Sequence, residues 1–389
     1  MRTGTPAAGR EAPRDRLGEL LAVFGRLGVL GFGGPMAHLA LLEREVVTRR
    51  GWLSRQRFLD ALAATNLVPG PNSTEMAIHV GYARAGVAGG LLSGVAFILP
   101  AFGLMLGLSW AYFRWSDVAA VGDLFYGVKP AVIAVVTLAA LRLGRAALAD
   151  WKLAAILAAS GALAYAYSGW EPVILLAAGF LGIGLYAPPR PSSSHLALAL
   201  PVALAAGVPA LAWRPDALVD LTLLFLRAGG LLFGGGYVMI PLIEHDVVDR
   251  LGWMTRQQFL DGVALGQATP GPIVITATFV GYKAAGLPGA AAATAAVFAP
   301  AFFFAMLLGR MLDTLRRSRL AQAFLKGIGA AVVGTILAVT AHLAREAFVD
   351  GWTIALGLGA LAALLLGRAD PVAVIVGGGL AGLALGPLR

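Results

Sequence analysis

Long apolar runs separated by short polar stretches dominate the chain. A helix needs about 20 apolar residues to cross the hydrocarbon core of a bilayer. Nine runs approach that length, at residues 86–113, 124–148, 151–168, 171–187, 195–213, 287–309, 327–344, 352–367 and 371–387. The pattern therefore predicts an all-α polytopic membrane protein.

Four further apolar segments are interrupted by glycine or proline. Residues 17–47 and 217–248 contain glycine-rich breaks, and residues 58–83 and 259–282 each contain Pro-Gly-Pro. Proline removes a backbone donor and clashes with the preceding turn, so these runs stop a helix. Broken backbone at membrane depth is tolerated only where it is buried in protein or lines a water-filled cavity. We expect each segment to be a re-entrant hairpin or a discontinuous spanning helix.

The chain contains the same unit twice. Residues 51–60 read GWLSRQRFLD and residues 252–261 read GWMTRQQFLD, an offset of 201. The same offset aligns the Phe-Gly-Gly stretches and the two Pro-Gly-Pro runs. We therefore divide the chain into an N-terminal tail (1–16), a first repeat (17–187), a linker with an extra spanning helix (188–216) and a second repeat (217–389).

Equivalent loops of the two repeats differ in charge. The net charges are +2 for 43–60 against −2 for 244–261, 0 for 114–129 against +4 for 310–326, and +2 for 142–152 against −1 for 342–352. Cytoplasmic loops carry the excess of Lys and Arg, so the two repeats are predicted to lie upside down to one another, as an inverted repeat. Re-entrant segments would place the N-terminal tail and the 43–60 loop in the cytoplasm. Discontinuous spanning helices would place the 43–60 loop outside.

Composition supports a membrane protein and excludes other classes. The chain is 58% hydrophobic and 13% charged, whereas a soluble domain carries about 25% charged residues. It has no cysteine, and its five histidines are scattered, so we expect no metal site and no cofactor. The formal net charge of +9 is attributed to cytoplasmic loops rather than to nucleic-acid binding. The sequence shows no nucleophile–base pair and no nucleotide-binding loop, so an enzyme is the least expected class. The Arg-rich N-terminus lacks the apolar core of a cleaved signal peptide.

The breaks offer sites for an anion. A helix that restarts after a break presents unpaired N–H groups and the positive end of its dipole. Candidate substrate-binding residues at the breaks are Gly33, Gly34, Asn66, Pro69, Gly70, Pro71, Asn72, Ser73, Thr74, Gly234, Gly235, Gln267, Pro270, Gly271 and Pro272. The alternative is that the glycines and prolines only shape helix packing.

Charged residues within apolar segments add to this prediction. Arg26 and Arg227 occupy matching positions before the glycine breaks, and a cation at membrane depth needs a partner or a function. They either bind the substrate anion or extend to the interface. Glu75 has no acidic counterpart; it either couples a proton, is paired with a cation such as Arg26, or serves as a first-turn helix acid. Glu43 and Glu244 are expected to be solvated or interfacial.

The repeated motif at residues 51–60 is interpreted as architectural. Ser54 and Thr255 are expected to cap the following helices, and Trp52 and Trp253 fit the aromatic belt at a membrane interface.

The Phe-Gly-Gly-Pro stretch at 32–35, the motif at 51–60 and the Pro-Gly-Pro at 69–71, all echoed in the second repeat, resemble the chromate ion transporter (CHR) family in its long, two-domain form. Gly236 departs from the pattern, since it replaces the proline. The resemblance implies a multi-pass carrier of the bacterial inner membrane that exports chromate and confers chromate resistance. A sulfate or other oxyanion carrier, a passive anion channel and a scaffold protein remain alternatives. The expected partners are a chromate-like or sulfate-like oxyanion, the lipid bilayer and a second copy in a homodimer, with no nucleic acid.

Overall fold

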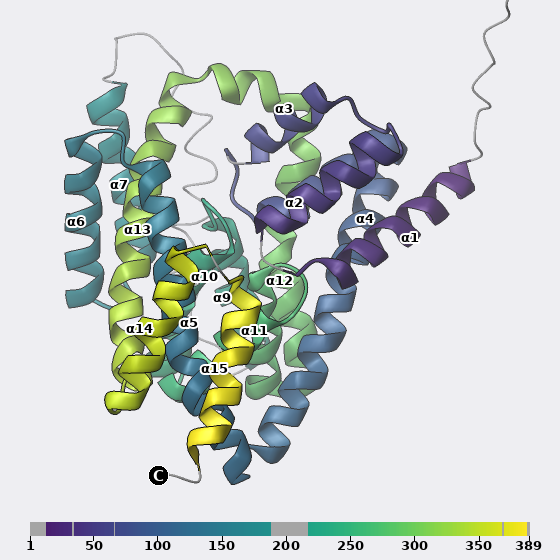
Figure 1. Cartoon of the computed structure of the whole chain (residues 1–389). Coiled ribbons are helices and arrows are strands. Elements are labelled where there is room, and N and C mark those ends of the chain that lie inside the picture. The colour runs from purple at the N-terminus through teal and green to yellow at the C-terminus, as the bar shows by residue number, and fades with distance from the viewer. Residues whose placement is uncertain (1–12, 33–34, 66, 188–216, 368, 387–389) are drawn as a thin grey trace, which may run out of the picture.

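The computed structural model describes residues 13–32, 35–65, 67–187, 217–367 and 369–386, and every regular element in these ranges is helical (Figure 1). The first half, from residue 13 to 187, contains α1 (Pro13–Leu30), α2 (Pro35–Glu43), the π-helix η1 (Arg44–Arg49), α3 (Arg55–Thr65), α4 (Asn72–Trp115), α5 (Ala119–Ala147), α6 (Trp151–Ala166) and α7 (Glu171–Tyr186).

The second half, from residue 217 to 386, repeats this order. It contains α9 (Ala217–Gly230), η3 (Gly236–Val238), α10 (Met239–His245), η4 (Asp246–Arg250), α11 (Arg256–Ala268), η5 (Ile273–Ile275), α12 (Thr276–Arg317), α13 (Arg319–Ala347), α14 (Gly351–Leu365) and α15 (Pro371–Leu385). The four expected breaks are confirmed, because helices end before each glycine or proline run and restart after it. The predicted spanning helix at 195–213 and its linker lie outside the described residues.

The first pair of helices folds back on itself. Arg26, near the end of α1, pairs with Glu45 in η1 at 2.8 Å, and Arg50, just after η1, pairs with Glu19 near the start of α1. These contacts require α1 and the α2–η1 helix to run antiparallel. The chain therefore leaves this hairpin at the end where it entered.

The second broken segment of the first half returns to that same end. Arg84 lies 4.6 Å from the centroid of the Trp52 ring, which precedes α3, and it pairs with Glu19 at 2.7 Å. The start of α3 and residue 84 of α4 are thus neighbours, although the break at residues 66–71 lies between them. α3 and the first 13 residues of α4 form a second hairpin.

A sharp turn then divides α4. Gly86 has φ 64 and ψ −153, a conformation that L-residues with side chains rarely adopt. The remaining residues, 87–115, form one long helix of about 43 Å at 1.5 Å per residue. α12 has the same turn at Gly286, with φ 63 and ψ −149.

The equivalent turns of the two halves lie at opposite ends of the long helix 87–115 within α4. Arg84 precedes the turn at the start of the long helix. Lys283, which precedes the turn of α12, lies 4.9 Å from the ring centroid of Phe113, near the other end of α4. Tyr282 stacks on the same Phe113 ring.

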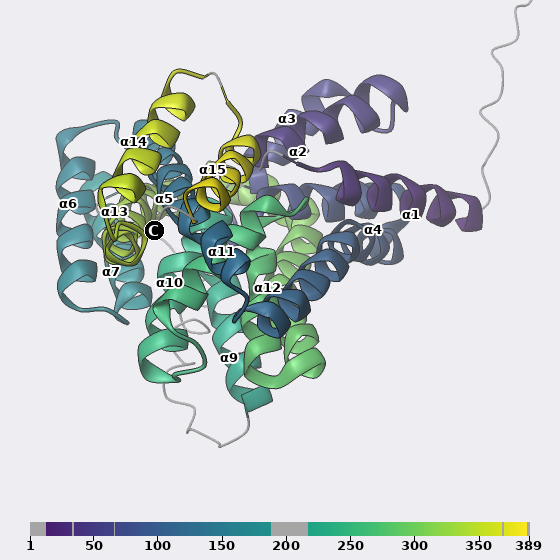
Figure 2. The same cartoon turned by 60° about the horizontal axis from the view of Figure 1, so that its bottom comes forward.

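The last helices of each half pack on the other half. α6 and α7 of the first half pack against α13 of the second, while α14 and α15 pack against α5 of the first. Figure 2 shows the resulting group of α5–α7 and α13–α15 beside the hairpins α1–α4 and α9–α12. Glycines allow close approach, since a Cβ at Gly127 would lie 1.9 Å from the carbonyl oxygen of Gly378. The two halves are therefore interlocked.

Among the described residues, four helices are long and apolar enough to cross a membrane: α4, α5, α13 and the helix from Ile273 to Leu307. α6 and α7 have 16 residues each, and α14 and α15 have 15 each. These four are apolar but shorter than the about 20 residues expected of a span. Asp150 and Asp350 cap the starts of α6 and α14, and these helices end at Ala166 and Leu365, two residues before the ends of the predicted runs 151–168 and 352–367.

Candidate functional site

The breaks of the two halves meet each other. The backbone N–H of Gly271, in the second Pro-Gly-Pro run, donates to the carbonyl oxygen of Gly31 at 2.8 Å. The N–H of Gly70, in the first run, donates to the carbonyl oxygen of Leu232 at 3.1 Å. The offset of 201 relates Gly31 to Leu232 and Gly70 to Gly271, so the two bonds are equivalent. We call this meeting of breaks the central joint.

The Pro-Gly-Pro loops are tightly enclosed at the joint. A Cβ on Gly271, whose φ is +105, would lie 2.7 Å from the Cβ of Ala101 in α4. A Cβ on Gly70, whose φ is +155, would lie 3.1 Å from the Cβ of Ala301 in α12. Each loop therefore rests on the long helix of the other half, and glycine is required at both positions for space and backbone conformation.

The start of α4 contributes buried polar groups to the joint. The carbonyl oxygen of Pro71 accepts from the N–H groups of Thr74 and Glu75, so the helix begins without a side-chain cap. Among the described residues, the Thr74 hydroxyl and both Glu75 carboxyl oxygens are buried without a hydrogen-bond partner. A Cβ on Gly70 would lie 2.5 Å from Glu75 Oε1, so this carboxyl group lies against the loop. Buried polar groups without partners are rare and indicate a site for a ligand, a water molecule or a proton.

His38 connects the two breaks, and the sequence reasoning missed it. Its Nε2 lies 2.7 Å from the carbonyl oxygen of Gly31, and its Nδ1 lies 3.3 Å from the Ser73 hydroxyl oxygen. A carbonyl only accepts, so Nε2 carries the proton and the neutral ring accepts from Ser73 at Nδ1. The Gly31 carbonyl thus accepts from His38 and from Gly271. The available signal was a histidine within an apolar stretch just after a glycine break.

The second half lines the joint differently. Gln267 of α11 is buried, and neither its amide oxygen nor its amide nitrogen has a hydrogen-bond partner in the described part of the chain. The carbonyl oxygen of Pro272 accepts from Ile275, and the Thr276 hydroxyl donates to the carbonyl oxygen of Ile273. Among the described residues, the unpaired group of the second half at the joint thus lies before its Pro-Gly-Pro run, whereas those of the first half, on Thr74 and Glu75, lie after it.

The glycine and asparagine candidates at the other breaks do not share one environment. Gly33, Gly34 and Asn66 lie outside the described residues. Gly234 and Gly235 have φ of +90 and +115, and a Cβ on either would meet nothing within 4 Å. Their conformation, rather than close packing, requires glycine there.

The two matched arginines each have an acidic partner. Arg26 pairs with Glu45 at 2.8 Å, and Arg227 pairs with Asp246. Glu45 and Asp246 are buried and equivalent at the offset of 201. The matched acids were visible in the sequence, but the sequence reasoning did not connect them with the arginines.

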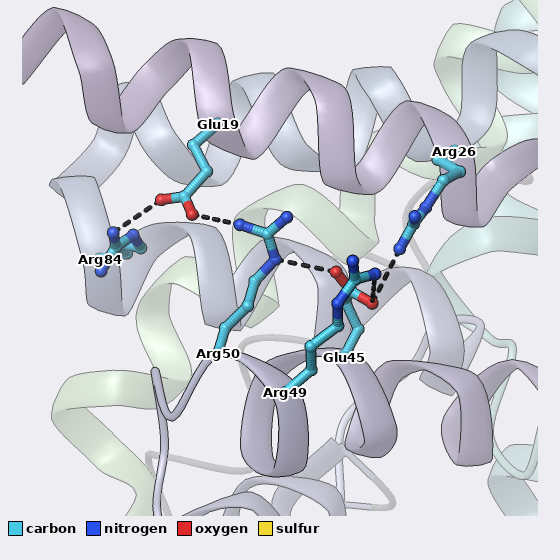
Figure 3. A network of polar contacts seen from close by, with 6 residues as sticks. All are labelled: Glu19, Arg26, Glu45, Arg49, Arg50 and Arg84. Atoms are coloured by element: carbon cyan, nitrogen blue, oxygen red, sulfur yellow. Dashed lines mark hydrogen bonds and ion pairs between the residues drawn. The ribbon is translucent and has the colours of Figure 1, made fainter.

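Around Arg26 lies a larger network on the α1–α2 hairpin (Figure 3). It comprises Glu19, Arg26, Glu45, Arg49, Arg50 and Arg84. Four arginines against two glutamates leave this end of the molecule positive. The equivalent network of the second half balances Arg227, Arg250 and Arg256 against Glu244, Asp246 and Asp249. The two ends therefore differ in charge in the direction that the loops predict.

Two expectations about acids were wrong. Glu244 is buried rather than solvated, because Arg256 Nε lies 2.6 Å from its carboxyl oxygen and supplies the counter-charge; its equivalent Glu43 pairs with Arg55 at 3.3 Å and is more exposed. The alternative that Glu75 pairs with Arg26 was also wrong, because among the described residues Arg26 pairs with Glu45 and both Glu75 carboxyl oxygens lack a partner.

Both expected helix caps are confirmed. The Ser54 hydroxyl accepts from the N–H of Arg57 at 3.3 Å, and Thr255 forms a capping box with Gln258. Within the part of the chain that the structure describes, no three His, Cys, Asp or Glu residues gather as metal ligands.

Comparison with known proteins gives consistent matches. The family model described as chromate transporter matches residues 18–183 and again 219–383. The chromate transport protein of Cupriavidus metallidurans is 35% identical over 99% of this chain and 97% of its own length. The chromate transport protein of Pseudomonas aeruginosa is 39% identical over 95% of this chain and 92% of its own length. An uncharacterized transporter of Bacillus subtilis is 28% identical over 43% of this chain and 96% of its own length. No solved structure matches the chain.

Proposed function

Because the chain belongs to the chromate transporter family, we propose that it is a membrane carrier for chromate, a tetrahedral dianion. Two relatives named for chromate transport cover nearly the whole chain, which supports this substrate class. In this proposal the carrier exports chromate across a bacterial inner membrane and so confers resistance. The family is one of transporters, so the chain is not an enzyme.

The central joint carries the proposal. Two equivalent hydrogen bonds connect Gly70 with Leu232 and Gly271 with Gly31, so broken backbone from both halves converges on one place. Backbone of this kind is tolerated at membrane depth only inside protein or beside an aqueous path. The N-terminal turn of α4, with Ser73 and Thr74, begins at the joint and favours an anion through its N–H groups and dipole. We propose that the oxyanion binds here.

The joint also supports the inverted topology. The turns at Gly86 and Gly286 lie near opposite ends of the long helix 87–115 within α4, and the positive network of the α1–α2 hairpin and its balanced counterpart are each associated with one of these turns. The positive-inside rule then assigns the 43–60 loop to the cytoplasm and the 244–261 loop to the opposite side. Both broken segments of the first half are re-entrant in this proposal. A carrier with two such halves can open alternately to either side around a fixed site.

Arg26 and Arg227 remain proposed anion-binding residues. A guanidinium has five N–H donors, so one carboxylate does not use all of them. Arg227 is better placed than Arg26 to attract a buried anion, because its side chain is 12% exposed against 47% for Arg26 and its charge is less screened by solvent. The arginines would attract the oxyanion while Glu45 and Asp246 prevent a permanent excess of buried positive charge.

Glu75 is proposed to couple proton movement to the oxyanion. It is fully buried against the Gly70 loop and has no hydrogen-bond partner within the ranges that the structure describes. A charged carboxylate would repel a dianion in the joint, so we propose that Glu75 takes up a proton when substrate binds. Proton binding and oxyanion binding then strengthen each other by the same factor.

Flux of labelled chromate into proteoliposomes tests the proposal. The pH gradient and the voltage are varied independently, and unlabelled sulfate is the competitor. Saturable flux that responds to the pH gradient supports a proton-coupled carrier. Flux that does not saturate indicates a passive channel, stronger transport of sulfate indicates a different oxyanion, and no anion-dependent flux refutes transport. Cross-linking in the same vesicles tests the expected homodimer.

A further inference from the structure

A buried charged cluster joins the two halves away from the central joint. Lys129 Nζ of α5 lies 3.7 Å from Asp261 Oδ1 of α11, and the Tyr112 hydroxyl of α4 donates to Asp261 Oδ2 at 2.7 Å. The side chains of Lys129 and Asp261 are 8% and 4% exposed. α4 and α5 belong to the first half and α11 to the second, so movement of one half past the other changes this cluster.

The cluster has no equivalent at the positions that the internal repeat relates to it. The positions that match Tyr112 and Lys129 are Leu312 and Gly329. The matching acid, Asp60, is partly exposed and accepts from Gln56 at 3.2 Å. By contrast, the ion pairs of both hairpins occur in both halves. A brace that the fold needs is expected twice, whereas this cluster occurs once among the described residues.

The ion pair is poorly optimised as a brace. Its N–O distance of 3.7 Å is long for a charge-assisted hydrogen bond, which is normally about 2.7–2.9 Å. Asp261 Oδ1 accepts no hydrogen bond within the described residues. A buried ammonium nevertheless needs a nearby anion, because desolvation is costly. The contact between Asp261 and Lys129 is thus long enough for another anion to take the place of the Asp261 carboxylate, whatever else Lys129 contacts.

The position of the cluster suits an anion path. α11 runs from Arg256, at the outer end of the second hairpin, to the break before Pro270. Asp261 lies nine residues before Pro270, which corresponds to about 14 Å along a helix. An oxyanion that moves between the central joint and the outer end of the second half would pass this level.

We propose that Lys129 is the charge-selecting group of the carrier, and that a passing oxyanion displaces Asp261 from it. Asp261 is then the internal anion that occupies Lys129 between transport cycles, and Tyr112 holds Asp261 when it is displaced. This inference rests on the proposed oxyanion transport. It assigns the selectivity for anions to this one contact between the halves and not to the equivalent contact around Asp60.

The test compares variants of the full chain in proteoliposomes and detergent, with inorganic chromate and sulfate as probes. Asp261→Asn removes the internal competitor, so we expect chromate to bind about tenfold more tightly and to be released more slowly. Lys129→Met is expected to abolish saturable flux, and Lys129→Arg to retain it. Asp60→Asn is the matched control, with unchanged affinity and flux.

The double variant Lys129→Met/Asp261→Asn separates transport from stability. A neutral pair of similar volume often stabilises a buried site as well as an ion pair does, so we expect a melting temperature near that of the parent but no saturable flux. Parent-like flux in this double variant would overturn the inference and leave the pair as a brace.

Tyr112→Phe tests the proposal without a change of charge, so it remains informative where the charge variants do not fold. Without the tyrosine hydroxyl, Asp261 competes better for Lys129, so oxyanion affinity should fall severalfold. An unchanged affinity would count against the proposed exchange. If the parent moves neither chromate nor sulfate, the transport proposal itself fails; parent flux with unaltered variants refutes only the role of the pair.

Discussion

Replacing Gly271 by alanine should disrupt the central joint in a way that a second substitution repairs. The new Cβ would lie 2.7 Å from the Cβ of Ala101, whereas ordinary contacts begin at 3.4 Å. Overpacking of this kind costs about 1–3 kcal/mol, and the φ of +105 adds strain of about 1–3 kcal/mol. We therefore expect Gly271→Ala to destabilise the protein by about 2–6 kcal/mol.

Gly234→Ala is the control for the backbone term. Its φ is +90, but a Cβ there meets nothing within 4 Å. It should therefore lose only the strain energy of about 1–3 kcal/mol. The difference between the two variants estimates the steric clash at the joint.

Ala101→Gly should rescue Gly271→Ala, because it removes the atom that the new methyl group meets. Alone, Ala101→Gly costs about 1 kcal/mol of helix propensity, so the double variant should be more stable than the sum of the single effects by about 1–3 kcal/mol. The equivalent rescue of Gly70→Ala by Ala301→Gly should fail, since the Glu75 carboxyl group, 2.5 Å from the new Cβ, remains in place.

The assay is a double-mutant cycle on the free energy of unfolding in detergent micelles, with chromate flux measured in parallel. Additive effects of Gly271→Ala and Ala101→Gly would show that loop and helix do not touch as described. Rescue of stability without rescue of flux would show that the loop also takes part in transport beyond its packing.

Three further predictions follow from the networks and the joint. Single cysteines at Ser54 and Thr255 should react with an impermeant reagent from opposite sides of the membrane, and labelling from the same side would refute the inversion. Arg227→Gln should weaken oxyanion affinity about ten- to a hundredfold through the lost charge-assisted bond, whereas Asp246→Asn should not; equal losses in both would make the pair structural. Glu75→Gln should keep oxyanion binding, make it less dependent on pH and abolish flux driven by a pH gradient, and affinity that still follows pH as in the parent would place the proton elsewhere.

The helix breaks were predictable because their causes are local. Pro69-Gly70-Pro71 and its copy stop a helix through missing donors and steric clash, whatever lies around them. The caps at Ser54 and Thr255 depend on residues three positions away. The net charges of the loops likewise required only a count over neighbouring residues. These features follow from physical effects that act within a few residues.

Contacts across the fold were harder to predict. Arg26 meets Glu45 only because a hairpin brings together residues 19 positions apart. His38 finds its carbonyl acceptor because α1 ends at Leu30 and leaves Gly31 outside the helix. The hydrophobic pattern shows that α14 is apolar, but it does not show that α5 of the other half packs against it. Such contacts depend on the whole arrangement rather than on local sequence.

The short outer helices have a consequence for the surrounding lipid. α6 and α7, at 16 residues each, are about 24 Å long, against a hydrocarbon thickness of about 30 Å. Trp151 and Trp170, at the starts of these helices, are 76% and 60% exposed. Hydrophobic mismatch of this size draws headgroups inward and thins the bilayer beside α6 and α7. The long helix α4, which is less buried than α5 and α13, fits a thicker bilayer, so the hydrophobic thickness of the protein differs between the side of α4 and the side of α6 and α7. We therefore expect lipid chain length to affect how easily the two halves move.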